Sequence, residues 1–200
     1  MRGRCCPGVP GRPLPGIQRG RLRSACFFGD EDCTAYLGWL RRYAASVRCS
    51  VHAYVLMGNH VHLLLTPSRE GGIAKLMRSS CGHYARYAEA VHHRDDMLWE
   101  DRFEAFPVHY GRYLLSCMRY IELNPVRAGV AARPEQYRWS SFRANALGHS
   151  DPLLTPHAHY CALGRDAASR QAAYRSLFHD PASLAFPRLA QARPQPPLKA

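Results

Sequence analysis

The chain has 200 residues, 46% of them hydrophobic, which suits one globular domain with a tail. Its 27 lysines and arginines outnumber 15 acidic residues, and the formal charge of +12 favours a polyanionic partner such as nucleic acid. A high-GC genome rich in arginine codons would raise the charge in the same way. No apolar run approaches the roughly 20 residues that span a bilayer, and the N-terminus lacks the apolar segment of a signal peptide.

The eight cysteines form no C-x-x-C pair, which argues against a zinc ribbon or a redox motif. Several fall within apolar helical patterns, so we expect reduced thiols that pack as small hydrophobes. Free thiols without a signal peptide predict a cytoplasmic protein.

Residues 1–16 hold three arginines, four prolines and four glycines, and we interpret them as a basic, flexible arm. A short strand near Ile17 and a turn follow. A helix is predicted from Asp32 to Val47, because acidic residues precede an apolar stripe of helical period.

A β-hairpin is predicted next, with strands Val51–Met57 and His60–Leu65 around the turn Gly58-Asn59. Side chains alternate across a strand, so His60 and His62 share one face, and the intervening apolar residues face the core. Two such imidazoles can bind one divalent metal ion. The alternative is a pair of ordinary half-buried strand histidines.

Beyond the hairpin, we expect a helix over 73–93, a strand over 98–108 and a helix over 112–123. Pro107 argues that this strand lies at a sheet edge. Residues 147–200 are interpreted as an irregular tail, partly disordered, with five prolines in the last twenty positions. The order of elements predicts an α+β fold: a ferredoxin-like antiparallel sheet with helices on one face, plus a C-terminal helix.

That last helix carries a second set of polar side chains. Tyr120 lies off its apolar stripe, Asn124 follows one turn later, and Arg127 would continue the same flank if the helix did. A phenol, an amide oxygen and a guanidinium would then point the same way. The alternative is that Tyr120 is a packing residue and Asn124 a C-cap ahead of Pro125.

Four sequence blocks occur in the order HAYVLMGNHVHLLLTP, LWEDRF, RYIELNPVRAG and YRWSSF. Together, over residues 17–146, they resemble the REP-associated tyrosine transposases, which are single-tyrosine HUH transposases of bacterial insertion sequences. The resemblance implies a ferredoxin-like fold, Mg²⁺ or Mn²⁺ as cofactor, and single-stranded DNA hairpins as substrate. It also implies a bacterial, nucleoid-associated protein that is a monomer or a homodimer.

Carried over by position, His60 and His62 match the family's metal-binding histidines, and Asn124 matches the polar residue that completes the metal site. Tyr120 matches the nucleophile, which forms a 5′-phosphotyrosine while DNA is cleaved and rejoined. The candidate DNA contacts are Arg2, Arg4, Arg12, Arg19, Arg21 and Arg127.

One departure from the family concerns the first strand, because Pro15-Gly16 runs directly into Ile17 and the strand looks shortened. A non-catalytic, hairpin-binding remnant of a transposase is therefore the alternative function, and a plasmid-type replication nickase is a third. A second H-x-H, His157 and His159, lies in an irregular region, and we do not expect it to bind metal.

Overall fold

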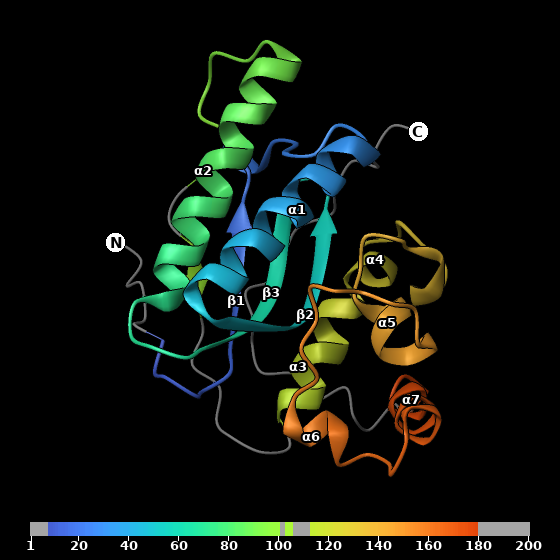
Figure 1. Cartoon of the computed structure of the whole chain (residues 1–200). Coiled ribbons are helices and arrows are strands. Elements are labelled where there is room, and N and C mark those ends of the chain that lie inside the picture. The colour runs from blue at the N-terminus through green and yellow to red at the C-terminus, as the bar shows by residue number, and fades with distance from the viewer. Residues whose placement is uncertain (1–7, 101–102, 106–112, 180–200) are drawn as a thin grey trace.

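The computed structural model describes residues 8–100, 103–105 and 113–179. Four antiparallel strands form one sheet in the order β2-β3-β1-β4. The strands are β1 Leu14–Arg19, β2 Cys49–Met57, β3 His60–Pro67 and β4 Glu104–Ala105. Helix α1, Asp30–Val47, joins β1 to β2, and helix α2, Gly72–His92, joins β3 to β4 (Figure 1). This is the ferredoxin-like α+β arrangement that the sequence predicts.

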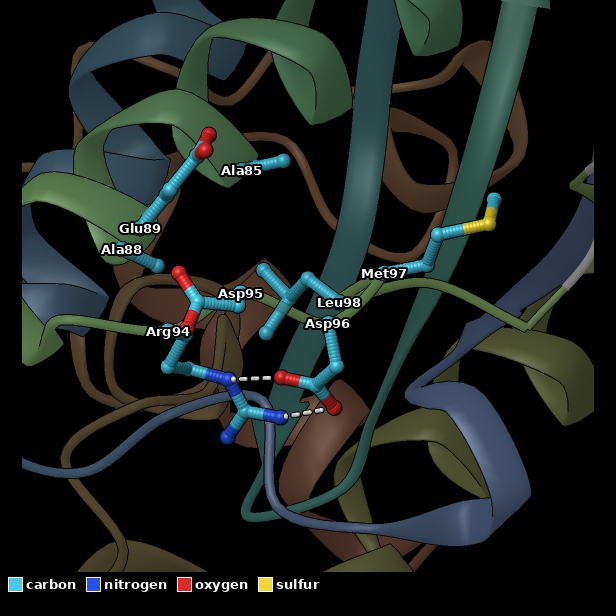
Figure 2. A pocket seen from close by; sticks show the side chains of 8 residues that line it. All are labelled: Ala85, Ala88, Glu89, Arg94, Asp95, Asp96, Met97 and Leu98. Carbon is cyan, nitrogen blue, oxygen red and sulfur yellow. Dashed lines mark hydrogen bonds and ion pairs between the residues drawn. The ribbon is translucent and has the colours of Figure 1, made fainter.

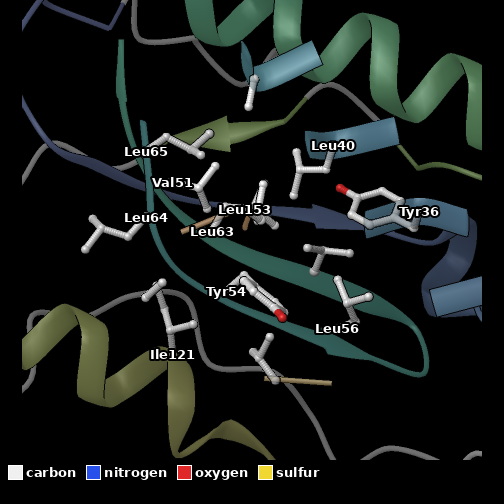
Figure 3. Close-up of a cluster of buried hydrophobic side chains, with 14 of the residues drawn as sticks. Tyr36, Leu40, Val51, Tyr54, Leu56, Leu63, Leu64, Leu65, Ile121 and Leu153 are labelled. Carbon is white, nitrogen blue, oxygen red and sulfur yellow. The ribbon is translucent and has the colours of Figure 1, made fainter. Parts of the chain in front are cut away.

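The β2–β3 hairpin is buried on both faces. Tyr36 and Leu40 of α1 pack on one side, and Ile121 of α3, Tyr113–Glu122, packs on the other (Figure 3). Val61, Leu63 and Leu65 are fully buried, as their alternation with the histidines predicts. The helix that carries Tyr120 therefore covers the sheet face opposite α1 and α2, which is the face of His60 and His62.

Helix α3 ends at Glu122, and a short helix α4, Asn124–Arg127, continues the chain after Leu123. Pro125 stands in the first turn of α4, where its missing N–H leaves no helical bond unmade. The Asn124-Pro125 dipeptide thus ends the preceding helix, as expected.

Strand β1 corrects the view of a shortened first strand. It begins at Leu14, inside the segment interpreted as an arm, and all six of its residues pair with β3, opposite both histidines. A Cβ on Gly16 would lie 2.1 Å from Phe103, so this glycine marks a close approach within the sheet. Pro15 pairs with Leu64 and lies outside the two-residue pairing with β4, so its missing donor is tolerated.

The predicted irregular tail is also wrong up to residue 179. It contains α6, Ala158–Cys161, and α7, Ala167–Ser176, and α7 packs on α5, Phe142–Leu147. Tyr160 and Tyr174 are buried, so these helices add to the core. Each of these helices buries a single residue, Tyr160 or Tyr174, so the sequence holds too few apolar positions to show a helical period. The disorder expected for the last twenty residues lies outside the described ranges, as does Pro107.

Two short 3₁₀ turns complete the fold, η1 Arg21–Arg23 and η2 Pro134–Gln136. The six cysteines in the described ranges are free thiols, and five of them are buried. Within those ranges, the helices are too short or too polar to cross a membrane.

Candidate metal and tyrosine site

His60 and His62 come from β3, and their rings lie side by side with centroids 4.8 Å apart. Both are nearly buried, 3% and 5% exposed. In the sheet His60 pairs with Arg19 of β1, and His62 pairs with Ile17. Directly opposed residues in antiparallel strands point to the same face, so Arg19 shares the histidine face.

The turn residue Asn59 fixes the tautomer of His60. Its amide nitrogen donates to the carbonyl oxygen of Arg23 at 3.0 Å, so its Oδ1 is the atom that faces His60. An oxygen only accepts, and His60 Nδ1 must therefore donate across the 2.7 Å contact. The lone pair of the neutral ring is then on Nε2, which is buried.

Both imidazoles are neutral at physiological pH. Burial, reinforced by the charges of Arg19 and Arg23, lowers the pKa of His60 to about 3. Burial lowers the pKa of His62 well below its usual value, with His60 and Arg19 acting in the same direction. Neutral imidazole is the form that coordinates a metal ion.

The two imidazoles, His60 and His62, are chemically suited to bind a divalent metal ion. His62 Nε2 is buried and meets no hydrogen-bond partner within the described ranges. A buried polar atom in that state is costly unless something binds it. A hydrogen-bonded Nδ1–H with the lone pair on Nε2, as His60 has, is the arrangement usual in histidines that bind a metal.

Tyr120 of α3 stands edge-on to His62, with ring centroids 5.8 Å apart. Its side chain is 5% exposed, and the guanidinium carbon of Arg127 lies 5.1 Å from the ring centroid. Burial raises the pKa of Tyr120, while the positive charges of Arg127 and Arg19 oppose that rise. The break between α3 and α4 has thus brought Arg127 over the tyrosine ring rather than along its flank.

Asn124 caps the end of α3, which is one of the two roles expected for it. Its amide nitrogen donates to the carbonyls of Tyr120 at 2.9 Å and Ile121 at 3.3 Å, which is a cap on the end of α3. The same bonds orient its Oδ1, which is the atom that could bind a cation. Capping therefore uses the amide nitrogen, and metal binding by Oδ1 stays a prediction.

The predicted DNA-binding arginines are spread over several settings. Arg19 pairs with Glu104 at 2.6 Å and its side chain is 14% exposed, whereas Arg12 and Arg21 are exposed. Arg2 and Arg4 lie outside the described residues. In the second H-x-H, His157 accepts from the backbone N–H of His159 at 3.1 Å and caps α6.

Two residues near the site went unnoticed in the sequence. The sequence predicts Asn59 only as a turn former, whereas its side chain links His60 to the loop after β1. Glu122 was passed over, although its place four residues after Met118 puts it on the apolar stripe of α3. It is fully buried and accepts hydrogen bonds from Ser141 at 2.6 Å, Asn145 at 2.8 Å and Tyr174 at 2.7 Å.

A pocket of about 240 Å³ lies elsewhere, between the end of α2 and residues 94–98. Figure 2 shows Arg94 holding Asp96 through two hydrogen bonds at its rim. Glu89 and Asp95 also line it. The pocket is lined by three carboxylates and by one arginine, and that arginine is already paired with Asp96. Its negative charge makes it a poor site for a phosphodiester.

The comparison with protein families agrees with this geometry. Residues 18–124, more than half of the chain, match the family described as IS200-like transposase. The chain belongs to the IS200-like transposase family. The matched range begins in β1 and ends at Asn124, so it includes both histidines and the tyrosine of this transposase.

Solved structures are similar to this chain, and one of them shows its fold. One, of a REP-associated tyrosine transposase bound to a REP hairpin, superposes with a TM-score of 0.63 at 15% identity, covering 78% of this chain and 93% of that one. Another, described as a transposase of Deinococcus radiodurans R1, gives a TM-score of 0.41 at 24% identity over 61% and 95% of the two chains. No curated protein matches the chain.

Proposed function

We propose that this transposase cleaves and rejoins single-stranded DNA beside hairpins, through a covalent bond between Tyr120 and a 5′-phosphate. The observation that carries the proposal is the edge-on contact of Tyr120 with His62 across the α3–β3 interface. It joins a potential nucleophile to a neutral imidazole whose Nε2 lies buried. Such a constellation is an expected arrangement for phosphoryl transfer onto a side-chain oxygen.

In the first step, the phenol oxygen of Tyr120 attacks the scissile phosphorus and forms an O–P bond. The bond from phosphorus to the 3′-oxygen breaks, and that oxygen leaves as a 3′-hydroxyl after taking up a proton. The phenol proton is lost in the same step. A second 3′-hydroxyl then attacks the phosphotyrosine, which restores the phenol and a DNA phosphodiester. The covalent link keeps the phosphodiester energy, so no nucleotide cofactor is required.

The residues of the chain supply orientation and charge. Arg127 and Arg19 favour the phenolate form of Tyr120, against the effect of its burial. His60, His62 and the Oδ1 of Asn124 would hold a divalent ion, Mg²⁺ or Mn²⁺. Such an ion would stabilise negative charge on the non-bridging oxygens of the phosphate.

The DNA substrate is proposed from three considerations. The family is one of transposases, the chain carries a formal charge of +12, and a structural relative at 15% identity is bound to a DNA hairpin. Arg12, Arg19, Arg21 and Arg127, with Arg2 and Arg4, are the proposed phosphate contacts. A cytoplasmic, nucleoid-associated location remains part of the same proposal.

The test is a covalent-adduct assay with hairpin oligonucleotides and Mn²⁺. Wild-type protein should give a protein–DNA band on a denaturing gel, with the modified peptide containing Tyr120. Tyr120→Phe keeps the packing against His62 but deletes the attacking oxygen, so it should bind DNA and give no band. Tyr113→Phe, on the exposed first turn of α3, is the matched control and should behave like wild type.

An adduct that persists in Tyr120→Phe would reject Tyr120 as the nucleophile. Hairpin binding by wild type without any adduct would instead favour the non-catalytic remnant. All six residues of β1 pair with β3 opposite both histidines, which supports the catalytic proposal over that alternative.

A further inference from the structure

The loop between β1 and α1 presents a large apolar side chain to solvent. Leu22 is 82% exposed, and the flanking Arg21 and Arg23 are exposed as well. An exposed leucine alone needs no explanation. Here it stands between two arginines on a protein of high positive charge, which is a setting that suits a polyanion with apolar faces.

The loop is held in a costly backbone conformation. Leu22 has φ 52° and ψ 25°, and Arg23 has φ 59°. These are left-handed values that residues with a Cβ adopt reluctantly, and here two such residues are consecutive. A glycine or asparagine would relieve the strain, and neither is present. Retained strain of this kind is found where a side chain must be presented in one direction.

Several hydrogen bonds keep the loop rigid. The backbone N–H of Arg21 donates to Leu98 at 2.9 Å, and the N–H groups of Arg23 and Ser24 donate back to Gly20 and Arg21, each at 2.9 Å. The side chain of Asn59 donates to the carbonyl of Arg23 at 3.0 Å. The loop is therefore held from two sides, by Leu98 and by Asn59 of the hairpin turn.

The same contacts place the loop beside the candidate metal site. Asn59 donates to Arg23 and accepts from His60, so one amide group joins the loop to a proposed ligand. The backbone N–H of Gly20 also donates to the Asn59 carbonyl at 2.9 Å. Leu22 thus precedes Arg23, whose carbonyl binds the same Asn59 side chain that orients His60.

We propose that Leu22 is a wedge that packs against an unpaired base next to the scissile phosphate, while Arg21 and Arg23 contact the flanking phosphates. Apolar side chains inserted beside bases unstack them, and a base with its π-face exposed is available in single-stranded DNA. A rigid loop suits this role, because no ordering of the loop opposes binding. The proposal rests on the proposed function and adds a base-contacting residue to it.

The experiment uses the full chain, without metal, and a hairpin oligonucleotide with a single-stranded flank carrying 2-aminopurine at successive positions. Wild type should change the fluorescence at one flank position, because the probe base leaves its stack. Leu22→Ser should lose that signal and bind about tenfold more weakly. Leu22→Met should keep both, and Leu147→Ser, a change at an exposed leucine of α5, should match wild type.

Salt dependence separates the base contact from the phosphate contacts. Arg21→Gln and Arg23→Gln should each reduce the slope of log affinity against log salt by about one, whereas Leu22→Ser should leave the slope unchanged. Thermal unfolding of each variant should match wild type, because these side chains are exposed.

Equal affinity and equal fluorescence for wild type and Leu22→Ser would overturn the wedge. So would a change in sedimentation without a change in DNA binding, since it would mean that Leu22 contacts another protein chain. Because the assay needs no cleavage, it can fail while the Tyr120 adduct forms, and it can succeed when no adduct forms.

Discussion

At the scale of single residues, the site depends on an asparagine in a turn. Asn59 donates to the Arg23 carbonyl and accepts from His60, so it fixes both the loop and the ring tautomer. Outer groups of this kind tune the affinity of a histidine site because they decide which nitrogen keeps its lone pair. A substitution of residue 59 should therefore change metal affinity while both proposed histidine ligands stay in place.

Asn59→Leu should weaken Mn²⁺ binding about 10- to 100-fold, because it removes the oxygen that accepts from His60 Nδ1. Asn59→Asp keeps an oxygen in that place and should stay close to wild-type affinity. Isothermal titration with Mn²⁺ measures both, and His62→Ala, which removes a proposed ligand, should show no binding. Equal affinities for the Leu and Asp variants would mean that the Asn59–His60 bond does not select the tautomer.

At the scale of elements, helix α3 is held in place by two buried polar side chains, Arg119 and Glu122. Glu122 of α3 accepts hydrogen bonds from Ser141 at the N-terminal end of α5, from Asn145 within α5, and from Tyr174 of α7. Burial raises the pKa of Glu122 to about 7, although the hydrogen bonds of these three donors act against the rise. Arg119 is also buried and donates to the carbonyl of Leu177, just after α7. The helix that carries Tyr120 is therefore positioned from the C-terminal side as well as by the sheet.

Glu122→Ala should lower the free energy of unfolding by roughly 3–5 kcal/mol, because three buried donors lose their acceptor together. Tyr174→Phe, which removes one donor, should cost about 1 kcal/mol. Urea denaturation followed by circular dichroism measures both. Glu135→Ala, at an ion pair on the surface, is the control and should change stability by less than about 1 kcal/mol. A loss for Glu122→Ala no larger than that of the control would show that this network does not hold α3.

At the scale of the whole molecule, the segment after residue 138 completes the sheet. The backbone N–H of Leu56 donates to Trp139, that of Ser141 donates to Tyr54, and that of Thr155 donates to Val51. These bonds cover the outer edge of β2, which would otherwise be open to another chain. The C-terminal helices are thus part of one cooperative unit with the sheet.

A chain that ends at Gly148 should therefore fail to fold stably. It loses two buried aromatic side chains, Tyr160 and Tyr174, worth together more than about 5 kcal/mol, which is comparable to the stability of a whole domain. It also uncovers part of the β2 edge and should self-associate. A chain that ends at His179 keeps these contacts and is the control. Differential scanning calorimetry and sedimentation velocity compare the two, and a cooperative, monomeric transition for the shorter chain would contradict the expectation.

The sequence by itself determined the elements whose signals are local. The hairpin, the three main helices and the place of Tyr120 follow from side-chain alternation, helical period and the Asn124-Pro125 break. These patterns depend only on neighbours along the chain, so they could be found without tertiary structure. The ferredoxin-like order of strands follows from them, because it is a rule of connection between successive elements.

Tertiary structure decided whatever depends on contacts distant in sequence. Local sequence places Gly16 in an arm, because its close approach to Phe103 depends on a residue 87 positions away. The folding of residues 147–179 depends on distant contacts such as the hydrogen bond from Tyr174 to Glu122, 52 residues earlier. The tautomer of His60 was set by an amide that also binds the β1–α1 loop. Each of these arises from burial and hydrogen bonding across the fold, and such pairings leave no periodic trace in the sequence.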